Sequence, residues 1–278
     1  MPPTDTPVET PPATPAGEQN NPTPITPSAG CGKGAPPTGQ LALTIRGNQA
    51  DYLVTLPPNY STTTPSPLIF AFHGRNRTFL QLQQVDASQI QTTMGARAVM
   101  VYPQSQGGTG WNAAAEVPPS VEFFEALYTQ LTENYCVDTS HVFAVGHSSG
   151  GYFSDILACR FGDRFRGIGD VSGAIQERAC NGSVAAMLVH GPNDTVVPFA
   201  GAVEMRDFYI ARNGCTSTTT PGPVSPCVTY QGCQAGLPVA FCQHDEPTYT
   251  DEVTGMTTNH GWPSFASQAI TNFLFALP

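Results

Sequence analysis

Lysine is nearly absent from this chain, since Lys33 is the only one among 278 residues. Lysine and arginine together number 11, against 21 aspartates and glutamates, which gives a formal net charge of −10 at pH 7. A surface this acidic repels phosphate groups, so neither nucleic acid nor an anionic lipid surface is expected as a partner. The charge favours a neutral or polymeric substrate instead.

Long hydrophobic runs are also missing, because none approaches the roughly 20 residues that a membrane helix needs. The N-terminus carries no charged segment followed by an apolar one, which is the pattern of a signal peptide. No Cys-x-x-Cys spacing and no cluster of cysteine and histidine points to zinc. Neither membrane insertion nor a bound metal is therefore expected.

Cysteine, in contrast, is abundant. A large and even number of cysteines is typical of disulfide-bonded proteins from oxidising compartments, so the chain is expected to be secreted. The last four are expected to link the Gly-, Pro- and Thr-rich segment that they enclose, and their pairing stays open. The eight cysteines are Cys31, Cys136, Cys159, Cys180, Cys215, Cys227, Cys233 and Cys242.

The N-terminal thirty residues are rich in proline and threonine and have almost no aliphatic side chains. Such a segment cannot bury enough apolar surface to offset chain entropy, so residues 1–30 are predicted to be a disordered linker. The linker either tethers the protein to a membrane, a cell wall or a further module, or is an inert spacer. Residues 31–278 suit one α/β domain, which is expected to be a monomer.

The folded part is predicted to begin with a β-hairpin, in which 41–46 and 51–56 alternate around a turn at Gly47-Asn48. Short continuous apolar runs follow, which are typical of strands covered on both faces in a parallel sheet. The segments between them have helical spacing, and Ser120 is expected to cap one helix. The alternation predicts a doubly wound, mostly parallel α/β sheet with an antiparallel start. The runs are 68–72, 98–102, 141–145, 167–171 and 185–190, and the helices are 121–135, 152–161, 201–213 and 264–276.

The stretch HVFAVGHSSGG, residues 141–151, combines an apolar strand with a Gly-x-Ser-x-Gly pattern. In α/β-hydrolases this pattern forms a sharp strand-to-helix turn that exposes a nucleophilic serine. The glycines are needed because a β-carbon beside the serine would obstruct so tight a turn. Ser148 is therefore the predicted nucleophile, and the predicted fold is the α/β-hydrolase fold.

A serine nucleophile needs a histidine to take its proton and a carboxylate to orient that histidine. α/β-hydrolases supply these groups in the order Ser, acid, His. Asp194 follows the run 185–190 and is the predicted acid, and His260 is the predicted base. His244 and Asp170 are the main rivals. Other candidates are interpreted as structural, pocket-lining or solvated side chains: His73, His141, His147, His190, Asp245 and Asp251.

Two backbone N–H groups are predicted to form an oxyanion hole, those of Ser149 and of Arg75 in the loop after the run 68–72. Trp111 lies in a Gly-rich loop and is a candidate for stacking on a substrate ring, with a core position as the alternative. His73 and Trp262 are further candidates for substrate contact, although packing is an alternative for both.

Six segments carry a combined pattern along the chain, in the order GCGKGAPPTGQLALTIRG, FHGRNRT, GWN, FAVGHSSGG, HGPNDTVVP and HGWPSFASQAI. Together they resemble secreted esterases of carbohydrate esterase family 1, in the group of feruloyl esterases and polyhydroxybutyrate depolymerases. The resemblance covers nearly everything from Cys31 onward and implies ester hydrolysis by Ser148, Asp194 and His260 without a cofactor. One departure is the long acidic segment between Cys242 and His260, which is expected to affect the pocket.

The resemblance implies hydrolysis of feruloyl esters of plant cell-wall polysaccharide, or of a small aromatic ester. Acetylxylan esterase and polyester depolymerase are alternatives with the same chemistry. An inactive hydrolase fold that binds carbohydrate is an alternative of another class, and the intact set of Ser, Asp and His disfavours it.

Overall fold

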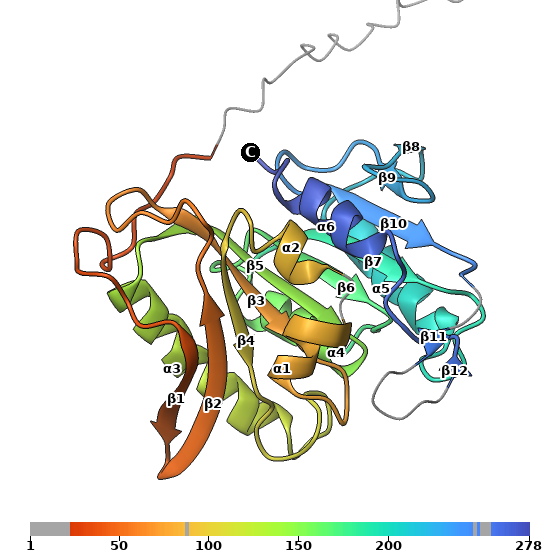
Figure 1. Ribbon diagram of the computed structural model, residues 1–278. Helices are drawn as coiled ribbons and strands as arrows, with labels where there is room; N and C mark the ends of the chain where they lie inside the picture. The colour runs from red at the N-terminus through yellow and green to blue at the C-terminus, as the bar shows by residue number, and fades with distance from the viewer. Residues whose placement is uncertain (1–22, 87–88, 247–248, 251–256) are drawn as a thin grey trace, which may run out of the picture.

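The computed structural model describes residues 23–86, 89–246, 249–250 and 257–278. A ten-stranded sheet runs through the described part in the order β1-β2-β4-β3-β5-β6-β7-β10-β9-β8 (Figure 1). The six strands from β4 to β10 in this order are parallel to one another. At one edge β1 and β2 pair antiparallel, as do β9 and β8 at the other edge. The strands are β1 (Gly39–Ile45), β2 (Asn48–Thr55), β3 (Ser66–Phe72), β4 (Val99–Pro103), β5 (Val137–His147), β6 (Gly167–Val171), β7 (Ala185–His190), β8 (Thr219–Pro221), β9 (Val228–Tyr230) and β10 (Val239–Gln243).

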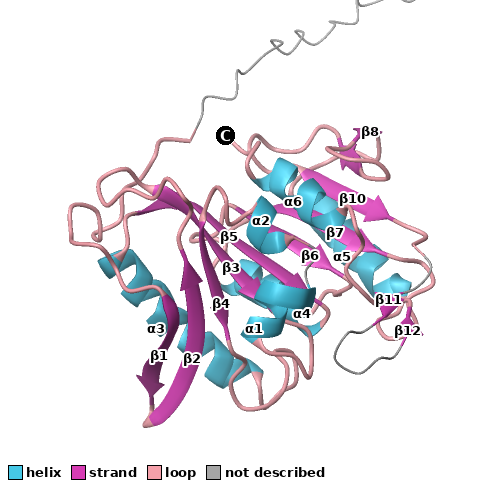
Figure 2. Cartoon of the chain, in the orientation of Figure 1, coloured by secondary structure: helices cyan, strands magenta, loops and turns pink. Residues whose placement is uncertain are grey.

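Helices cover both faces of the sheet (Figure 2). One face packs against α3, α4 and α5, and the other against α1, α2 and α6. The predicted doubly wound architecture is therefore present in the structure. The helical elements are α1 (Phe79–Gln81), the π-helical turn η1 (Leu82–Asp86), α2 (Ile90–Thr93), α3 (Val117–Asn134), α4 (Ser149–Arg160), α5 (Phe199–Arg212) and α6 (Ala266–Leu274).

Strand β3 illustrates how continuous apolar runs supply both cores. Successive side chains point to opposite faces of a sheet, so Leu68 and Phe70 pack with α3 and α4 while Ile69 and Ala71 pack with α6. All four side chains are completely buried. A strand covered on both faces gains nothing from polar residues, which explains why the central strands read as unbroken apolar runs.

The folded part begins earlier than the sequence predicts. Ser28 N–H donates to Val137 O at 2.9 Å, and Thr26 N–H donates to the carboxylate of Asp138 at 2.9 Å. The end of the predicted linker thus runs beside β5, because these backbone hydrogen bonds do not depend on apolar side chains. The rest of the predicted linker, residues 1–22, lies outside the described residues.

The N-terminal hairpin is present with a different turn. Ile45 pairs with Asn48, so the two turn residues are Arg46 and Gly47 rather than Gly47 and Asn48. Both turn residues have positive φ, 49° and 83°. This conformation is favoured in two-residue hairpins because its twist matches that of the strands.

Helix α3 begins at Val117, before the Ser120 cap that the sequence predicts. Its first turn contains Pro118 and Pro119, which fit there because the first turn needs no backbone N–H donors. The Ser120 hydroxyl instead accepts a hydrogen bond from Gln106 N–H at 3.3 Å. The cap was misassigned because proline is tolerated at a helix start.

Strands β8, β9 and β10 were not expected, since they lie in the Gly-, Pro- and Thr-rich segment. Strand β10 pairs in parallel with β7, and the β8–β9 hairpin extends the sheet beyond it. Two disulfides hold this extension, Cys215–Cys233 and Cys227–Cys242. The structure thus resolves the pairing that the sequence left open and confirms that these four cysteines link the segment.

The other disulfides are Cys31–Cys136, which ties the N-terminal segment to the start of β5, and Cys159–Cys180, which ties α4 to the chain before β7. All eight cysteines are therefore bonded, as is typical of proteins from oxidising compartments. In the described part of the chain, no helix is both long and apolar enough to cross a membrane.

Removing disulfides is expected to destabilise the protein in the order of the loops that they close. In the chain-entropy account, loss of Cys31–Cys136, with a separation of 105 residues, costs roughly 4–5 kcal/mol of unfolding free energy. Loss of Cys215–Cys233, with a separation of 18, costs about 3 kcal/mol. Urea denaturation of the Cys→Ser pairs measures both values. A larger loss for the shorter loop would contradict the expectation.

Candidate active site

The turn between β5 and α4 has the geometry of a strained strand-to-helix elbow. Ser148 has φ 54° and ψ −119°, a backbone conformation that L-residues rarely adopt. A β-carbon on Gly146 would lie 2.1 Å from Gly150 O, and one on Gly150 would lie 2.2 Å from Phe72 O. Glycine is therefore required at both positions, which is why the pattern predicts this turn correctly.

Asp194 and His260 are brought together although they are 66 residues apart. His260 Nδ1 lies 2.6 Å from Asp194 Oδ2, and Asp194 Oδ1 accepts hydrogen bonds from Val196 N–H and Val197 N–H at 2.8 and 2.9 Å. Burial alone would raise the pKa of Asp194, but the hydrogen bond from His260 and the two amides outweigh it and lower that pKa. The Asp194 carboxylate is thus ionised and directed at the imidazole.

Asn259 joins the loops that carry these two residues, and sequence reasoning gave it no role. Its side-chain oxygen accepts hydrogen bonds from Thr195 N–H at 3.2 Å and from the Thr195 hydroxyl at 3.0 Å. Its side-chain amide donates to Asn193 O. No local pattern marks this role, because the partners of Asn259 lie 64 and 66 residues earlier in the chain.

The His260 loop lies against the elbow. The ring of His147, the residue before Ser148, is 5.1 Å from the ring of His260, and the Ser172 hydroxyl donates to Gly261 O at 3.2 Å. Val171, next to Ser172, accepts a hydrogen bond from Ser148 N–H at 2.8 Å. His260 Nε2 is buried and forms no hydrogen bond within the described residues. Because Nδ1 is engaged with Asp194, Nε2 is the ring nitrogen that can accept a proton from another group.

His147 stays neutral beside His260. Burial lowers the pKa of His147 to about 3, and the charges of His260 and Arg77 act in the same direction. A neutral ring at this position adds no repulsion when His260 becomes protonated.

The loop after β3 also reaches the elbow. A β-carbon on Gly74 would lie 3.1 Å from His147 Nδ1 and 3.7 Å from Ser148 Cβ. The backbone N–H groups of Arg75 and Ser149, the predicted oxyanion donors, form no hydrogen bond within the described residues. The Arg75 side chain forms an ion pair with Glu116.

The predicted substrate contacts are buried in the core. Trp111 is 1 % exposed, stacks on Phe153 and donates its indole N–H to His73 O at 2.9 Å. His73 is fully buried, and burial lowers its pKa to about 4. Trp262 is 5 % exposed and donates to the Ser267 hydroxyl at 3.0 Å. The structure thus places the rings of Trp111, His73 and Trp262 inside the protein, which favours the packing alternative for each of them.

Two other histidines were candidates for the base. His141 pairs with Asp138 at 2.7 Å near the amino end of β5, roughly 20 Å along the strand from the elbow. His244 is buried near the loop of Asp194, where a β-carbon on Gly191 would lie 3.1 Å from its Cε1, and its ring packs against Phe265 at 5.9 Å. The hydrogen bond to Asp194 at 2.6 Å comes from His260.

Asp170, the rival acid, is buried beneath the first turn of α4. Its Oδ1 accepts a hydrogen bond from Gly173 N–H at 2.9 Å, and a β-carbon on Gly151 would lie 2.5 Å from its Oδ2. Burial raises the pKa of Asp170 to about 8. A protonated acid in this place cannot supply the negative charge that an imidazolium needs.

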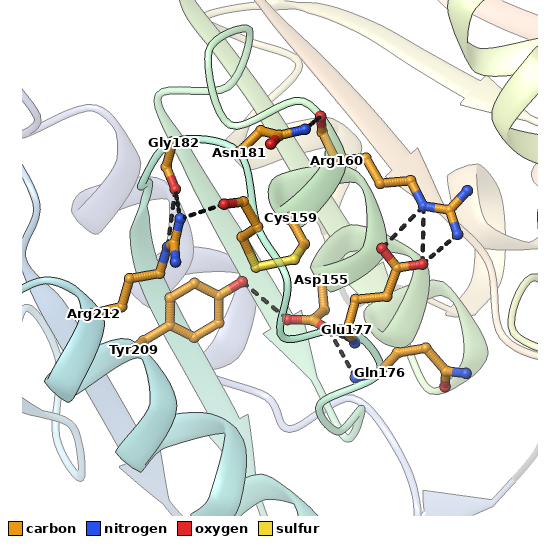
Figure 3. The surroundings of a disulfide bond; sticks show 10 residues. Asp155, Cys159, Arg160, Gln176, Glu177, Asn181, Gly182, Tyr209 and Arg212 are labelled. Carbon is orange, nitrogen blue, oxygen red and sulfur yellow. Dashed lines mark hydrogen bonds and ion pairs between the residues drawn. A yellow bond between two sulfur atoms is a disulfide. The ribbon is translucent and has the colours of Figure 1, made fainter.

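Helix α4 is fixed at its far end by a polar network that the sequence did not predict (Figure 3). Asp155 is completely buried and accepts hydrogen bonds from Gln176 N–H at 2.8 Å, Glu177 N–H at 3.1 Å and the Tyr209 hydroxyl at 3.0 Å. The Cys159–Cys180 disulfide and the ion pair between Arg160 and Glu177 join the same segments. These contacts hold the helix whose first residue follows Ser148.

Comparison with known proteins identifies esterases. The family model described as "Putative esterase" matches residues 45–195. Feruloyl esterase D of Neurospora crassa is 33% identical over 242 residues, which cover 78% of this chain and 81% of that protein. Feruloyl esterase C of Emericella nidulans is 32% identical over 234 residues, which cover 78% and 82%.

Solved structures show the same fold. A ferulic acid esterase has a TM-score of 0.60 at 15% identity and covers 87% of this chain and 98% of its own. Acetyl xylan esterase from Aspergillus awamori has a TM-score of 0.59 at 15% identity and covers 74% and 92%. The predicted α/β-hydrolase fold is thereby confirmed.

Strain at Ser148 predicts an unusual stability order. Glycine tolerates φ 54° and ψ −119°, whereas alanine keeps the β-carbon that makes this conformation costly. The strain of about 1–3 kcal/mol is offset in part by the greater unfolded-chain entropy of glycine. The free energy of unfolding of Ser148→Gly, measured by urea denaturation, is therefore expected to be about 1 kcal/mol higher than that of Ser148→Ala. Equal stability of the two variants would show that the elbow is unstrained.

Asp170 predicts a pH-dependent stability. Because its folded pKa of about 8 is raised above the ordinary 3.8, its contribution to stability is complete below about pH 4 and is lost as the pH rises toward 8. Asp170→Asn removes this titration. The free energy of unfolding of the variant, relative to that of the wild type, is therefore expected to rise by at least about 1 kcal/mol between pH 5 and pH 8. Denaturation at both pH values measures the gain. Asp163→Asn, at an exposed position, is the control, and parallel profiles for all three proteins would disprove the raised pKa.

Proposed function

The chain belongs to the esterase family that matches its residues 45–195 and is a carboxylic ester hydrolase, and from this premise we propose that it cleaves feruloyl esters. The proposed substrate is esterified plant cell-wall polysaccharide or a small aromatic ester. Relatives that are 33% and 32% identical over most of the chain are feruloyl esterases, and this supports the choice. The four disulfides support a secreted enzyme.

The observation that carries the proposed mechanism is the Asp194–His260 hydrogen bond of 2.6 Å beside the elbow at Ser148. Asp194 accepts the Nδ1 proton of His260, which leaves Nε2 as the basic nitrogen. The Asp194 carboxylate remains ionised because three donors hold it. It stabilises the imidazolium that forms when His260 takes a proton.

The reaction proceeds in two halves. Ser148 Oγ attacks the ester carbonyl carbon while its proton passes to His260 Nε2. The tetrahedral intermediate collapses when His260 gives this proton to the leaving alcohol oxygen, and an acyl-enzyme remains on Ser148. A water molecule then attacks the acyl carbon, His260 accepts its proton, and the proton returns to Ser148 Oγ as the carboxylic acid leaves.

Negative charge on the carbonyl oxygen is stabilised by the backbone N–H groups of Arg75 and Ser149. Neither group has an acceptor within the described residues, and Ser149 is the first residue of α4, where a helix N-terminus favours negative charge. No further group is needed to activate the ester in this mechanism.

Hydrolysis of p-nitrophenyl acetate tests the mechanism. The wild type is expected to turn the ester over, and Ser148→Ala and Asp194→Asn are each expected to lower kcat by about 10⁴-fold or more. His141 is a matched control, because its hydrogen bond to Asp138 is also a histidine–carboxylate pair. His141→Gln is expected to keep the wild-type rate. An inactive wild type would favour the carbohydrate-binding alternative and reject the enzyme.

A comparison of rates tests the substrate. Methyl ferulate, acetylated xylan and a polyester film are given to the same wild-type preparation. A higher kcat/KM on methyl ferulate is expected, together with release of ferulate from feruloylated arabinoxylan. A preference for the acetyl or polyester substrate would reject the feruloyl assignment and leave the mechanism in place.

A further inference from the structure

Glu116 is a buried carboxylate that the catalytic mechanism does not use. It lies at the start of α3 and is 5 % exposed, and both of its carboxylate oxygens accept hydrogen bonds. Arg75 donates through Nη1 to Oε1 at 2.8 Å and through Nη2 to Oε2 at 2.7 Å. Gly110 N–H donates to Oε1 at 3.2 Å, and Ala113 N–H donates to Oε2 at 3.0 Å. A carboxylate with four donors fixes every segment that supplies one.

The segments fixed in this way are the loop after β3 and the loop between β4 and α3. Arg75 also donates through Nη2 to the side chain of Asn112 at 2.9 Å, and Asn76 N–H donates to Thr109 O at 2.9 Å. The loop that carries the proposed oxyanion donor of Arg75 is thus anchored to its neighbour by side-chain and backbone hydrogen bonds. Glu116 is the acceptor of the bidentate pair at the centre of this arrangement.

The second loop also contacts the elbow helix. A β-carbon on Gly110 would lie 2.8 Å from the guanidinium carbon of Arg75 and 3.1 Å from Ser149 Oγ. Gly110 therefore passes between the two residues whose amides are the proposed oxyanion donors. Its own amide is hydrogen-bonded to Glu116, so the carboxylate sets how far this backbone stands from both residues.

Glu116 is ionised at neutral pH. The hydrogen bond from Arg75 lowers the pKa of Glu116 to about 2, with further lowering by the amides of Ala113 and Gly110 and opposition from burial. Glutamine has the same shape but replaces one acceptor oxygen with an NH₂ group that faces a guanidinium donor. Glu116→Gln therefore breaks the fork while it leaves the volume of the side chain unchanged.

We propose that Glu116 is a positioning residue, which acts through Arg75 and Gly110 to hold the Arg75 amide at the oxyanion site. This proposal rests on the proposed esterase mechanism. Glu116 contacts no reacting atom. Its effect is on the placement of a donor whose contribution arises in the transition state, so it acts on kcat and not on substrate affinity.

The test compares kcat and KM of full-length variants on p-nitrophenyl acetate. Complete loss of one oxyanion donor lowers kcat by about 10²–10³-fold, so a misplaced donor in Glu116→Gln is expected to lower kcat by about 10–100-fold. KM is expected to change less than about threefold. Arg75→Ala keeps the backbone amide and is expected to show a similar loss. The double variant is expected to match either single one, because both changes remove the same contact.

Arg46 and Glu122 supply a control, since Arg46 Nε donates to Glu122 Oε1 at 2.8 Å at the exposed surface, and Glu122 belongs to the same helix α3 that begins after Glu116. Glu122→Gln is expected to keep wild-type kcat. Near-ultraviolet circular dichroism confirms that each variant is folded, and Arg75→Lys, which keeps the charge but not the fork, is expected to fall between Arg75→Ala and the wild type.

Glu116→Gln with wild-type kcat would overturn the positioning role, and so would additive losses in the double variant. An equal loss in Glu122→Gln would also overturn it, because the effect would then be a general one on stability. In each of these outcomes the wild type remains active, so the proposed function stands. In this test an inactive wild type is the outcome that would reject the proposed esterase mechanism itself.

Discussion

Close approach of backbone to backbone at the elbow determines where the other parts of the site lie. At Gly150, helix α4 passes so near the end of β3 that a β-carbon would lie 2.2 Å from Phe72 O and 2.8 Å from His73 O. The chain leaves β3 at this point, so the loop with Gly74 and Arg75 starts beside the turn that carries Ser148. One contact between glycine and strand thus places the nucleophile and the proposed oxyanion donor together. A larger residue at Gly150 would push α4 away from β3 and so separate the nucleophile from this donor.

Buried carboxylates in this protein differ in pKa although most of them have several donors. Asp194, Glu116 and Asp155 each accept at least two backbone N–H groups, and each also has a side-chain donor. These donors lower the pKa of Asp194 and of Glu116, whereas burial prevails at Asp155 and raises its pKa to about 6. Asp170 has one amide donor within the described residues, and burial raises its pKa to about 8. Backbone amides supply part of the counter-charge for these carboxylates and add no side chain to the site.

Local patterns predicted the parts of this protein that depend on neighbours in sequence. The elbow follows from two glycines around Ser148, and the chain order of α/β-hydrolases led to Asp194 and His260. Flanking glycines suggested an open loop at Trp111, whereas the structure buries this side chain and so favours the core alternative. Close packing, and not an open loop, requires glycine in this segment, since a β-carbon on Gly108 would lie 2.5 Å from Glu116 Oε1. The role of Glu116 could not be predicted from the sequence, because its partners come from separate loops and form no pattern of fixed spacing.

Strands β11 (Tyr249–Thr250) and β12 (Thr257–Thr258) pair with each other and form a ladder separate from the main sheet. The chain therefore leaves and re-enters the described structure at adjacent points, shortly before His260. The ends of the intervening segment are fixed by this ladder and not by the segment's own length. Thr258, the last residue of β12, is two residues before His260, and its hydroxyl accepts a hydrogen bond from His260 N–H at 2.9 Å. The position of the imidazole beside Asp194 is therefore set by backbone pairing in this ladder as well as by the hydrogen bond of its own ring.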